Sequence, residues 1–143
     1  MIVEHFKGLN CTGTDAATTL KRTLIRRELI DSAQKPAIRT DNGPQFISDA
    51  FGQACLELPI EHERIPCRTP NKNAHIESFH SILEDDCLSK YEFQSYADAY
   101  EKVSGYIKFY NKVRIHGSIL DMAQEAFYQE NRNKYMKIKE IRL

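Results

Sequence analysis

Two carboxylates in this sequence have surroundings that suit metal-dependent chemistry. Asp41 follows a short β-forming segment, residues 37–40, and precedes Asn42-Gly43-Pro44, the strongest turn signal in the chain. Ligands of α/β proteins gather at the C-terminal ends of the strands, so a carboxylate at this point is a candidate ligand. The alternative is an aspartate that bonds to the backbone of its own turn.

Glu77 is the second candidate. It lies near the start of an expected helix, residues 72–88, beside the apolar face of that helix. The alternative here is a solvent-exposed helix glutamate. The 35 residues between the two carboxylates, 42–76, are expected to form a helix, a strand and a proline-containing loop. Such a path can return the chain to the end of the first strand.

Carboxylates held at one point repel each other unless a divalent cation lies between them. Oxygen ligands of this kind favour magnesium or manganese. Two such ions can activate a hydroxyl group and stabilise the leaving oxygen of a phosphoryl transfer. The pair therefore predicts a metal-dependent catalytic site with Asp41 and Glu77 as ligands.

The elements that must position these residues alternate between strands and helices. Periodicity, capping residues and turn signals predict three strands and five helices. The strands are expected at residues 2–6, 37–40 and 59–65, and the helices from 14 or 15 to 31, from 48 or 49 to 56, and at 72–88, 96–113 and 123–135. This order indicates an α/β fold, although three strands are few for one.

Composition narrows the class of protein. Hydrophobic residues make up 41% of the 143 residues and charged residues 28%, as in an ordinary soluble domain. No apolar run approaches the roughly 18 residues of a membrane span, and the first ten residues lack the features of a secretory signal. Four widely spaced cysteines indicate reduced, mostly buried thiols rather than disulfides or a zinc site. A cytoplasmic location without membrane contact is expected.

The distribution of charge leaves two interpretations open. The formal net charge is zero, which by itself argues against a general nucleic-acid binder. Basic residues are nevertheless concentrated around residues 21–27, 64–72 and 108–114. Each cluster fits either a DNA-facing surface or a solvated helix face.

Four segments resemble one known family in order and in spacing. RTDNGPQFIS resembles the segment around the second catalytic aspartate of retroviral-integrase-like transposases of bacterial insertion sequences, and NAHIESFHSIL resembles the segment around their catalytic glutamate. The 35-residue gap matches their D-D-35-E signature. YNKVRIHGSI resembles their Tyr-Asn-x-x-Arg-x-His-x-x-Leu element, and MIVEHF with CTGTDAATTLKRTL resembles the strand and helix before the second aspartate.

The resemblance implies a ribonuclease H-like fold, with an incomplete mixed sheet of about three strands and flanking helices. Residues 1–120 would form the integrase-type core and residues 121–143 a helical tail. Asp41 and Glu77 would hold catalytic magnesium (or manganese) ions for DNA cleavage and strand transfer. The residues that would contact DNA are Arg68, Lys72, Asn73 and His75 near the glutamate, and Tyr110, Asn111, Arg114 and His116 in the downstream motif.

This sequence also departs from the family pattern. The family's first catalytic aspartate lies on a strand upstream of the part that MIVEHF matches, and this chain begins too late to include it. Lys72 stands where the family commonly has an aspartate, and AQEAF at residues 123–127 replaces Ser-Pro-x-Glu-Phe. The expectation is a catalytic core that binds magnesium weakly and is inactive alone.

Two other functional interpretations remain. The chain is alternatively a truncated fragment that oligomerises or binds DNA and thereby inhibits a full-length transposase, or a plain α/β domain with chance motifs. Loss of upstream strands would leave the strand that ends at Asp41 with an open edge. A second copy can cover such an edge, which predicts a homodimer or higher oligomer with an interface on the order of 2,000 Å². The segment 66–73 is expected to be less ordered than its flanks.

Overall fold

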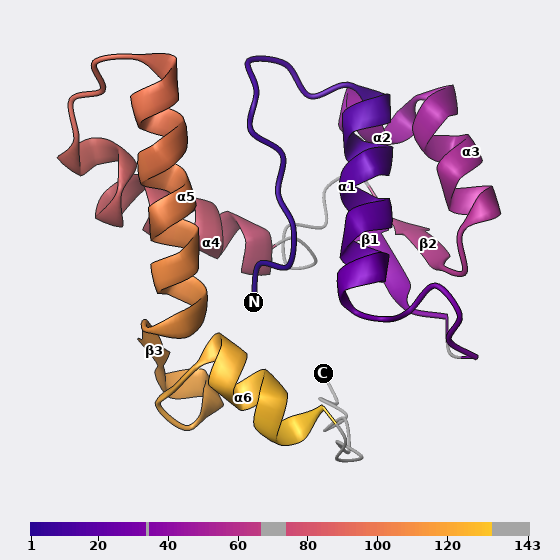
Figure 1. Cartoon of the computed structure of the whole chain (residues 1–143). Coiled ribbons are helices and arrows are strands. Elements are labelled where there is room, and N and C mark those ends of the chain that lie inside the picture. The colour runs from indigo at the N-terminus through magenta and orange to yellow at the C-terminus, as the bar shows by residue number, and fades with distance from the viewer. Residues whose placement is uncertain (34, 67–73, 133–143) are drawn as a thin grey trace. The chain divides into compact units, whose positions relative to one another are not determined.

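The structure is a computed structural model that describes residues 1–33, 35–66 and 74–132 (Figure 1). The chain divides into two compact units. One is Val3–Asp86, and the other combines Met1–Ile2 with Cys87–Leu143. None of the helices in the described ranges is long and apolar enough to cross a membrane.

The first helix of the Val3–Asp86 unit begins with a reciprocal cap. This helix, α1, spans Gly13–Arg26. The Thr12 hydroxyl accepts a hydrogen bond from the Asp15 amide at 3.2 Å, and the Thr12 amide donates to the Asp15 carboxylate at 2.9 Å. These bonds occupy amides that the first turn leaves unpaired. Hydrogen bonds from the Thr12 hydroxyl and amide lower the pKa of Asp15, because they stabilise the charged carboxylate.

Both ends of α1 differ from the prediction. The cap is Thr12, whereas Thr14 or Asp15 was predicted, because the capping box places Asp15 at the third helical position. The helix ends at Arg26 and not near residue 31, and Glu28 adopts a left-handed φ of 56° shortly after it. A left-handed residue at this point is a common way to end a helix.

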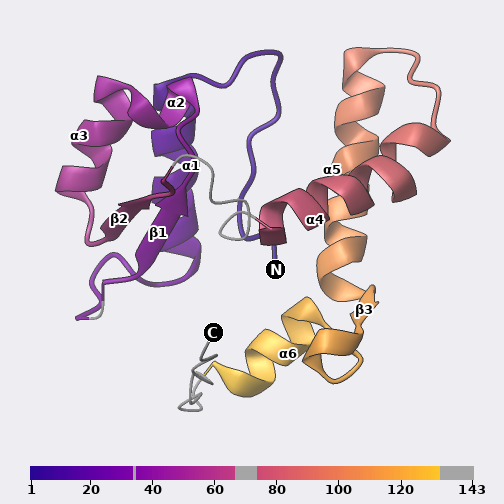
Figure 2. The same ribbon diagram turned by 180° about the vertical axis from the view of Figure 1, so that it is seen from behind.

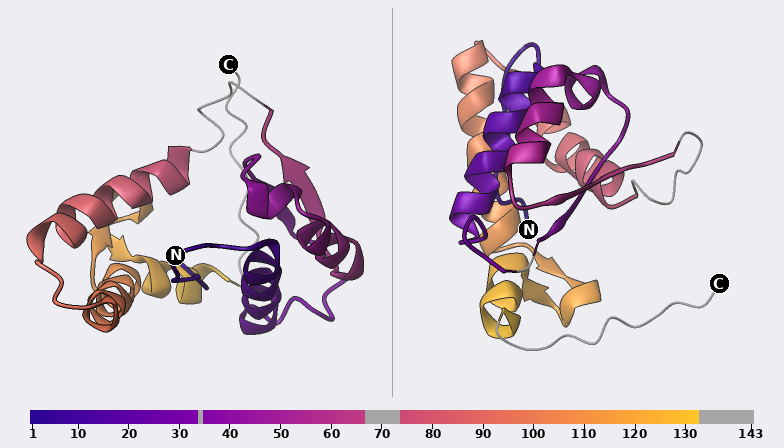
Figure 3. Two further views of the ribbon diagram at one scale, coloured as in Figure 1. Left: turned by 90° about the horizontal axis from the view of Figure 1, so that it is seen from above. Right: turned by 90° about the vertical axis from the view of Figure 1, so that its right-hand side faces the viewer.

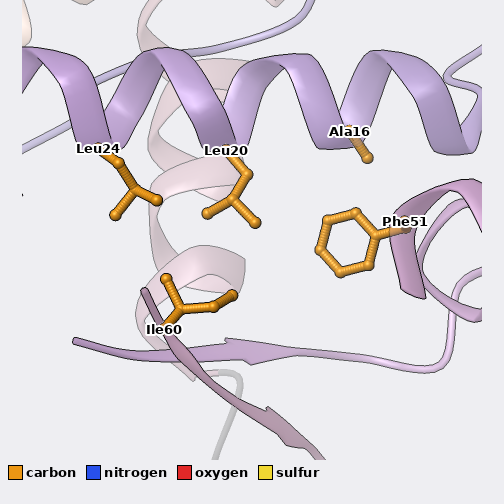
Figure 4. Close-up of a cluster of buried hydrophobic side chains, with 5 residues drawn as sticks. All are labelled: Ala16, Leu20, Leu24, Phe51 and Ile60. Atoms are coloured by element: carbon orange, nitrogen blue, oxygen red, sulfur yellow. The ribbon is translucent and has the colours of Figure 1, made fainter. Parts of the chain in front are cut away.

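A small apolar core holds α1 to the rest of its unit. Ala16, Leu20 and Leu24 point from one face of α1 toward Phe51 and Ile60 (Figure 4). Leu24 is 1% exposed and Phe51 is 2% exposed. Burial of apolar side chains is the main favourable term in folding, so this contact fixes the helix over the strands.

Two short strands and two short helices complete the part of this unit before residue 66. They are β1 (Ala37–Thr40), α2 (Pro44–Ile47), α3 (Asp49–Glu57) and β2 (Glu61–Arg64). The predicted strand at 37–40 is confirmed, and the predicted strand at 59–65 forms over its central residues. The predicted helix from Ser48 or Asp49 is also confirmed, with the Ser48 hydroxyl accepting from the Phe51 amide at 3.3 Å.

β1 and β2 form a parallel pair that α2 and α3 connect. Ala37 lies opposite Glu61, and Thr40 lies opposite Arg64. Seen from the front and from behind, α1 and α3 cover the same face of the pair (Figures 1 and 2). On the other face, Arg39 and Glu63 form an exposed ion pair at 2.8 Å. Side chains of a strand alternate between the faces, so Thr40 lies on the helix-covered side, where it is buried.

The predicted strand at residues 2–6 is not formed. The Val3 carbonyl accepts a hydrogen bond from the Arg26 guanidinium at 3.1 Å, and Glu4 pairs with the same guanidinium at 2.8 Å. A strand needs a neighbouring backbone to satisfy its polar groups, and here a side chain takes that role. In the described part of the chain, the strands form two separate pairs, β1 with β2 and β3 with β4, and not one three-stranded sheet.

The predicted helix at 72–88 corresponds to α4 (Ala74–Asp86), which belongs to the Val3–Asp86 unit. The other unit is mainly helical and contains the predicted helix at 96–113. Its elements are η2 (Leu88–Lys90), α5 (Tyr96–Lys112), β3 (Ile115–His116), η3 (Gly117–Ile119), β4 (Met122–Ala123) and α6 (Gln124–Asn131). Ser95 caps α5 by accepting from the Asp98 amide at 3.1 Å.

In this unit α6 lies against the C-terminal end of α5 (Figure 3). β3 and β4 pair antiparallel, with Ile115 opposite Ala123, and so join the two helices. The predicted tail helix is confirmed over the residues of α6, and its remainder to residue 135 lies outside the described residues. The predicted domain boundary at residue 120 stays a prediction.

Candidate functional site

Asp41 lies immediately after β1, where the sequence predicts it. Its carboxylate is exposed, and its Oδ1 accepts a hydrogen bond from the Gly43 amide at 2.9 Å. One oxygen of Asp41 thus bonds to the backbone of its own turn, as the alternative interpretation expects. This bond does not exclude the ligand interpretation, because a carboxylate offers two oxygens and several lone pairs. The bond orients the group and leaves it accessible.

The residues on both sides of Asp41 are tied to the end of β2. The Thr40 carbonyl accepts from the Ile65 amide at 2.9 Å, and the Asn42 side-chain amide donates to the Ile65 carbonyl at 2.9 Å. Asn42 was predicted only as a turn residue, because nothing local in the sequence shows that its amide reaches another strand. The backbone at Asp41 is therefore fixed from both directions.

Glu77 lies in the first turn of α4 and is exposed. It belongs to the same compact unit as Asp41. That the two carboxylates come within bridging distance of a metal ion stays a prediction. Within the described ranges, no three His, Cys, Asp or Glu side chains are grouped so that they could hold a metal ion. Two exposed carboxylates nevertheless have the donor chemistry that magnesium prefers.

Three predicted DNA contacts, Arg68, Lys72 and Asn73, lie outside the described residues. The expectation of lower order at 66–73 falls on the same segment, of which only Pro66 is described. His75 is exposed in the first turn of α4, near Glu77 in the sequence. Its contact with DNA stays a prediction. Of the described cysteines, Cys87 is buried, Cys55 is half-buried and Cys11 is exposed, and all three are free thiols.

The downstream motif forms a compact internal cluster. Tyr110 is buried at 6% exposure, and the Arg114 guanidinium lies over its ring at 5.8 Å from the centroid. The His116 ring meets the Tyr110 ring edge to face, with centroids 5.0 Å apart. Arg114 also approaches His116 Nδ1 at 3.4 Å. These contacts hold β3 against the last turn of α5.

Asn111 joins the two sequence-distant parts of its unit. Its Oδ1 accepts from the Ile2 amide at 2.9 Å, and its Nδ2 donates to the Ile2 carbonyl at 2.7 Å. The side-chain amide thus pairs with the backbone of one residue as a neighbouring strand would. That the motif residues contact DNA stays a prediction. Each of them also makes contacts within its own unit, which sequence reasoning missed.

His116 lies in surroundings that disfavour its charged form. Burial lowers its pKa below 6.5, and the positive charge of Arg114 acts in the same direction, whereas a hydrogen bond with the Tyr110 backbone opposes them. Its Nε2 atom is buried and has no hydrogen-bond partner in the described part of the chain. A neutral imidazole fits this place better than a cation does.

The sequence of residues 58–123 matches the family described as the integrase core domain. A protein of 39.2 kDa from insertion element IS476 of Xanthomonas euvesicatoria is 42% identical over 82 residues, which are 57% of this chain and 24% of that protein. A protein of 31.7 kDa from insertion element IS407 of Burkholderia multivorans is 32% identical over 96 residues, which are 67% of this chain and 35% of that protein. These matches relate residues 58–123 to the integrase core domain and the chain to insertion-element proteins. The predicted resemblance is confirmed.

The integrase core assignment extends to the fold. The chain is similar to a chain of the simian T-cell lymphotropic virus intasome, solved in complex with the PP2A regulatory subunit B56 gamma. The TM-score is 0.71 at 19% identity, over 94% of this chain and 46% of that one. The predicted ribonuclease H-like fold is confirmed at this level. The chain spans about a quarter and about a third of the lengths of the two insertion-element relatives.

Replacing Asn111 by Ala should destabilise the unit that contains α5. Two hydrogen bonds to Ile2 are lost, and their net contribution is about 1–2 kcal/mol of unfolding free energy. Asn111→Asp should lose at least as much, because a carboxylate cannot donate to the Ile2 carbonyl. The measurement is urea unfolding followed by circular dichroism, since the chain has no tryptophan. The matched control is the neighbouring exposed Lys112→Ala, and equal stability of Asn111→Ala and this control would refute the role.

The free energy of unfolding should fall as the pH drops below about 6.5. The folded-state pKa of His116 is lowered, so the unfolded chain binds more protons than the folded chain between that pKa and 6.5. The contribution is present above the unfolded pKa and is lost on acidification. His116→Gln should therefore show a shallower slope between pH 7 and pH 5 in the same unfolding measurement. An unchanged slope would show that His116 titrates alike in both states.

Proposed function

We propose that this chain supplies part of the catalytic core of an insertion-element transposase, which carries out metal-dependent DNA cleavage and strand transfer at the element ends. The observation that carries the proposal is the placement of Asp41. An exposed carboxylate directly follows β1, and hydrogen bonds fix the backbone on both sides of it. Rigid support of this kind is what a metal ligand requires.

Asp41 and Glu77 are the proposed ligands of catalytic magnesium or manganese ions. The ions would activate an attacking oxygen and stabilise the leaving one. Gly43 orients the Asp41 carboxylate through its amide, and the start of α4 carries Glu77. Asp15 is not proposed as a ligand, because it lies in the first turn of α1 and does not follow a strand, and its Oδ2 accepts two hydrogen bonds in the helix cap. A third ligand is expected from outside these residues, so the chain alone is proposed to bind metal weakly and to be inactive.

DNA is the proposed partner of this site. The segment between β2 and Glu77 contains the proposed DNA contacts Arg68, Lys72, Asn73 and His75. A DNA strand bound by this segment would therefore pass the proposed metal ligands. Basic and amide side chains at such a place position phosphates without reading the base sequence. The element ends and the target are therefore the proposed DNA substrates.

Metal binding tests this function directly. Addition of Mn²⁺ to the full chain should broaden the amide NMR signals of residues 41–43 and of the first turn of α4, because the ion is paramagnetic. Asp41→Asn and Glu77→Gln should each abolish the broadening at both places. The matched control is Asp31→Asn, an exposed aspartate of the same unit, which should change nothing. Broadening that persists in Asp41→Asn would refute the proposed site.

A second candidate function is self-association, through which the chain would join and inhibit a full-length transposase. In the described residues β1 and β2 each have one strand neighbour, which leaves the other edge of each strand free for pairing. Large apolar side chains are also exposed, among them Leu9, Leu56 and Leu120 at 80% or more. Surfaces of this kind favour association with a second copy.

Light scattering of the purified chain should therefore give the mass of a dimer or a higher oligomer at micromolar concentration. Mixing the chain with a full-length relative should lower the activity of that relative as the chain is added in excess. A monomer mass over the whole concentration range would exclude this second function. It would leave the proposed metal site unaffected.

A further inference from the structure

Thr40, the residue before Asp41, is a buried polar side chain. It is 7% exposed, and its hydroxyl lies 2.9 Å from Nε2 of His62 on β2. Buried hydroxyl groups need a hydrogen-bond partner, because an unpaired one keeps the full cost of its lost hydration. His62 supplies that partner to the residue that directly precedes the proposed metal ligand.

His62 also reaches the chain that follows Asp41. Its ring meets the Phe51 ring edge to face, with centroids 5.4 Å apart and planes at 77°. Phe51 meets Phe46 in the same way, with centroids 5.2 Å apart. Phe46 belongs to α2, which begins directly after the Asp41 turn. His62 is thus linked to both flanks of the turn, directly to Thr40 by a hydrogen bond and indirectly to Phe46 through the Phe51 ring.

The His62 ring is fixed by its place in the sheet. In the parallel register it lies opposite Ile38, and its ring contacts Phe51 of α3. Burial lowers its pKa, and the positive charge of Arg64 acts in the same direction. A neutral imidazole in a packed site has few alternative orientations, so it can hold a neighbour in one position.

We propose that His62 is a positioning residue for Asp41, acting on it through the Thr40 hydroxyl and through the Phe51–Phe46 contact. This inference rests on the proposed function, in which Asp41 holds a metal ion. Ligands must stay within a fraction of an ångström of their productive geometry, so a residue that fixes the turn affects metal affinity without touching the metal. Sequence reasoning treated His62 only as part of a strand.

Paired variants separate the hydrogen bond from the packing. His62→Phe keeps an aromatic ring beside Phe51 and removes the partner of Thr40, whereas His62→Gln keeps a polar nitrogen at a similar reach. Thr40→Val removes the hydroxyl at constant shape, and Thr40→Ser keeps it. The matched control is Glu63→Gln, which lies next to His62 on β2 and breaks only the exposed pair with Arg39.

Two readouts are taken from the full chain. The first is amide–water exchange of Gly43, whose amide donates to the Asp41 carboxylate. His62→Phe and Thr40→Val should each speed this exchange by about five-fold, the equivalent of one hydrogen bond. Thr40→Ser and Glu63→Gln should leave it near the wild-type rate, and His62→Gln, which keeps a hydrogen-bonding nitrogen but loses the ring beside Phe51, should speed it less than His62→Phe does. The second readout is the Mn²⁺ affinity at Asp41, which should weaken several-fold in the same two variants.

Each outcome decides the proposal. Unchanged Gly43 exchange in His62→Phe overturns it, and so does an equal rise at Leu24 of α1, which would mark general loss of stability. Absence of Mn²⁺ binding at Asp41 in the wild-type chain overturns the proposed function, while the exchange measurement still decides whether His62 positions the turn. Faster Gly43 exchange with unchanged Mn²⁺ affinity overturns the link to metal binding.

Discussion

The candidate site depends on the parallel pairing of β1 with β2. Only four residues of each strand are paired, yet the bonds at the end of the pair, from Ile65 to Thr40 and from Asn42 to Ile65, fix the chain on both sides of Asp41. Such a short pair has little stability by itself. Burial of Leu24 and Phe51 between α1 and α3 supplies stability that the hydrogen bonds of the strand pair do not. The apolar core of this unit therefore also determines the position of an exposed carboxylate.

Exposure of Asp41 and its hydrogen bond to Gly43 serve different purposes. The bond uses one oxygen to set the direction of the carboxylate, and exposure leaves the group accessible from solvent. Turn chemistry and ligand chemistry are thus compatible at one residue. Asp15 differs from Asp41 in its place, because its Oδ2 accepts two hydrogen bonds from Thr12 in the cap of a helix and not at the end of a strand. Local hydrogen bonding distinguishes the two aspartates.

The residues of the downstream motif make contacts that stabilise their own unit. Tyr110, Arg114 and His116 contact one another, and Asn111 pairs with the backbone of Ile2. Side chains engaged in this way hold β3 against α5 and fasten the first residues of the chain to the same helix. A substitution in the motif would therefore alter folding and any DNA contact together. Measurements of stability beside activity are needed to separate the two effects.

The sequence alone was enough to predict the resemblance to integrase-like transposases, the α/β order, the strand at 37–40 and the helices that correspond to α3, α4 and α5. These features depend on short-range patterns, on turn residues such as Asn42 and Gly43, and on motifs at fixed spacing. The sequence also placed Asp41 at the end of a strand. The residues Ile2, Val3, His5 and Phe6 suggested a strand at residues 2–6, but a strand requires a partner that no local pattern reveals.

Only the tertiary structure decided how side chains far apart in the sequence pair. The amide of Asn111 meets Ile2 across 109 positions, Asn42 reaches Ile65, and Thr40 finds His62 on the neighbouring strand. Each of these bonds satisfies a polar group that burial or lack of a strand partner would otherwise leave unpaired. That requirement follows from the packing of the whole unit. It therefore cannot be read from the neighbours of a residue in the chain.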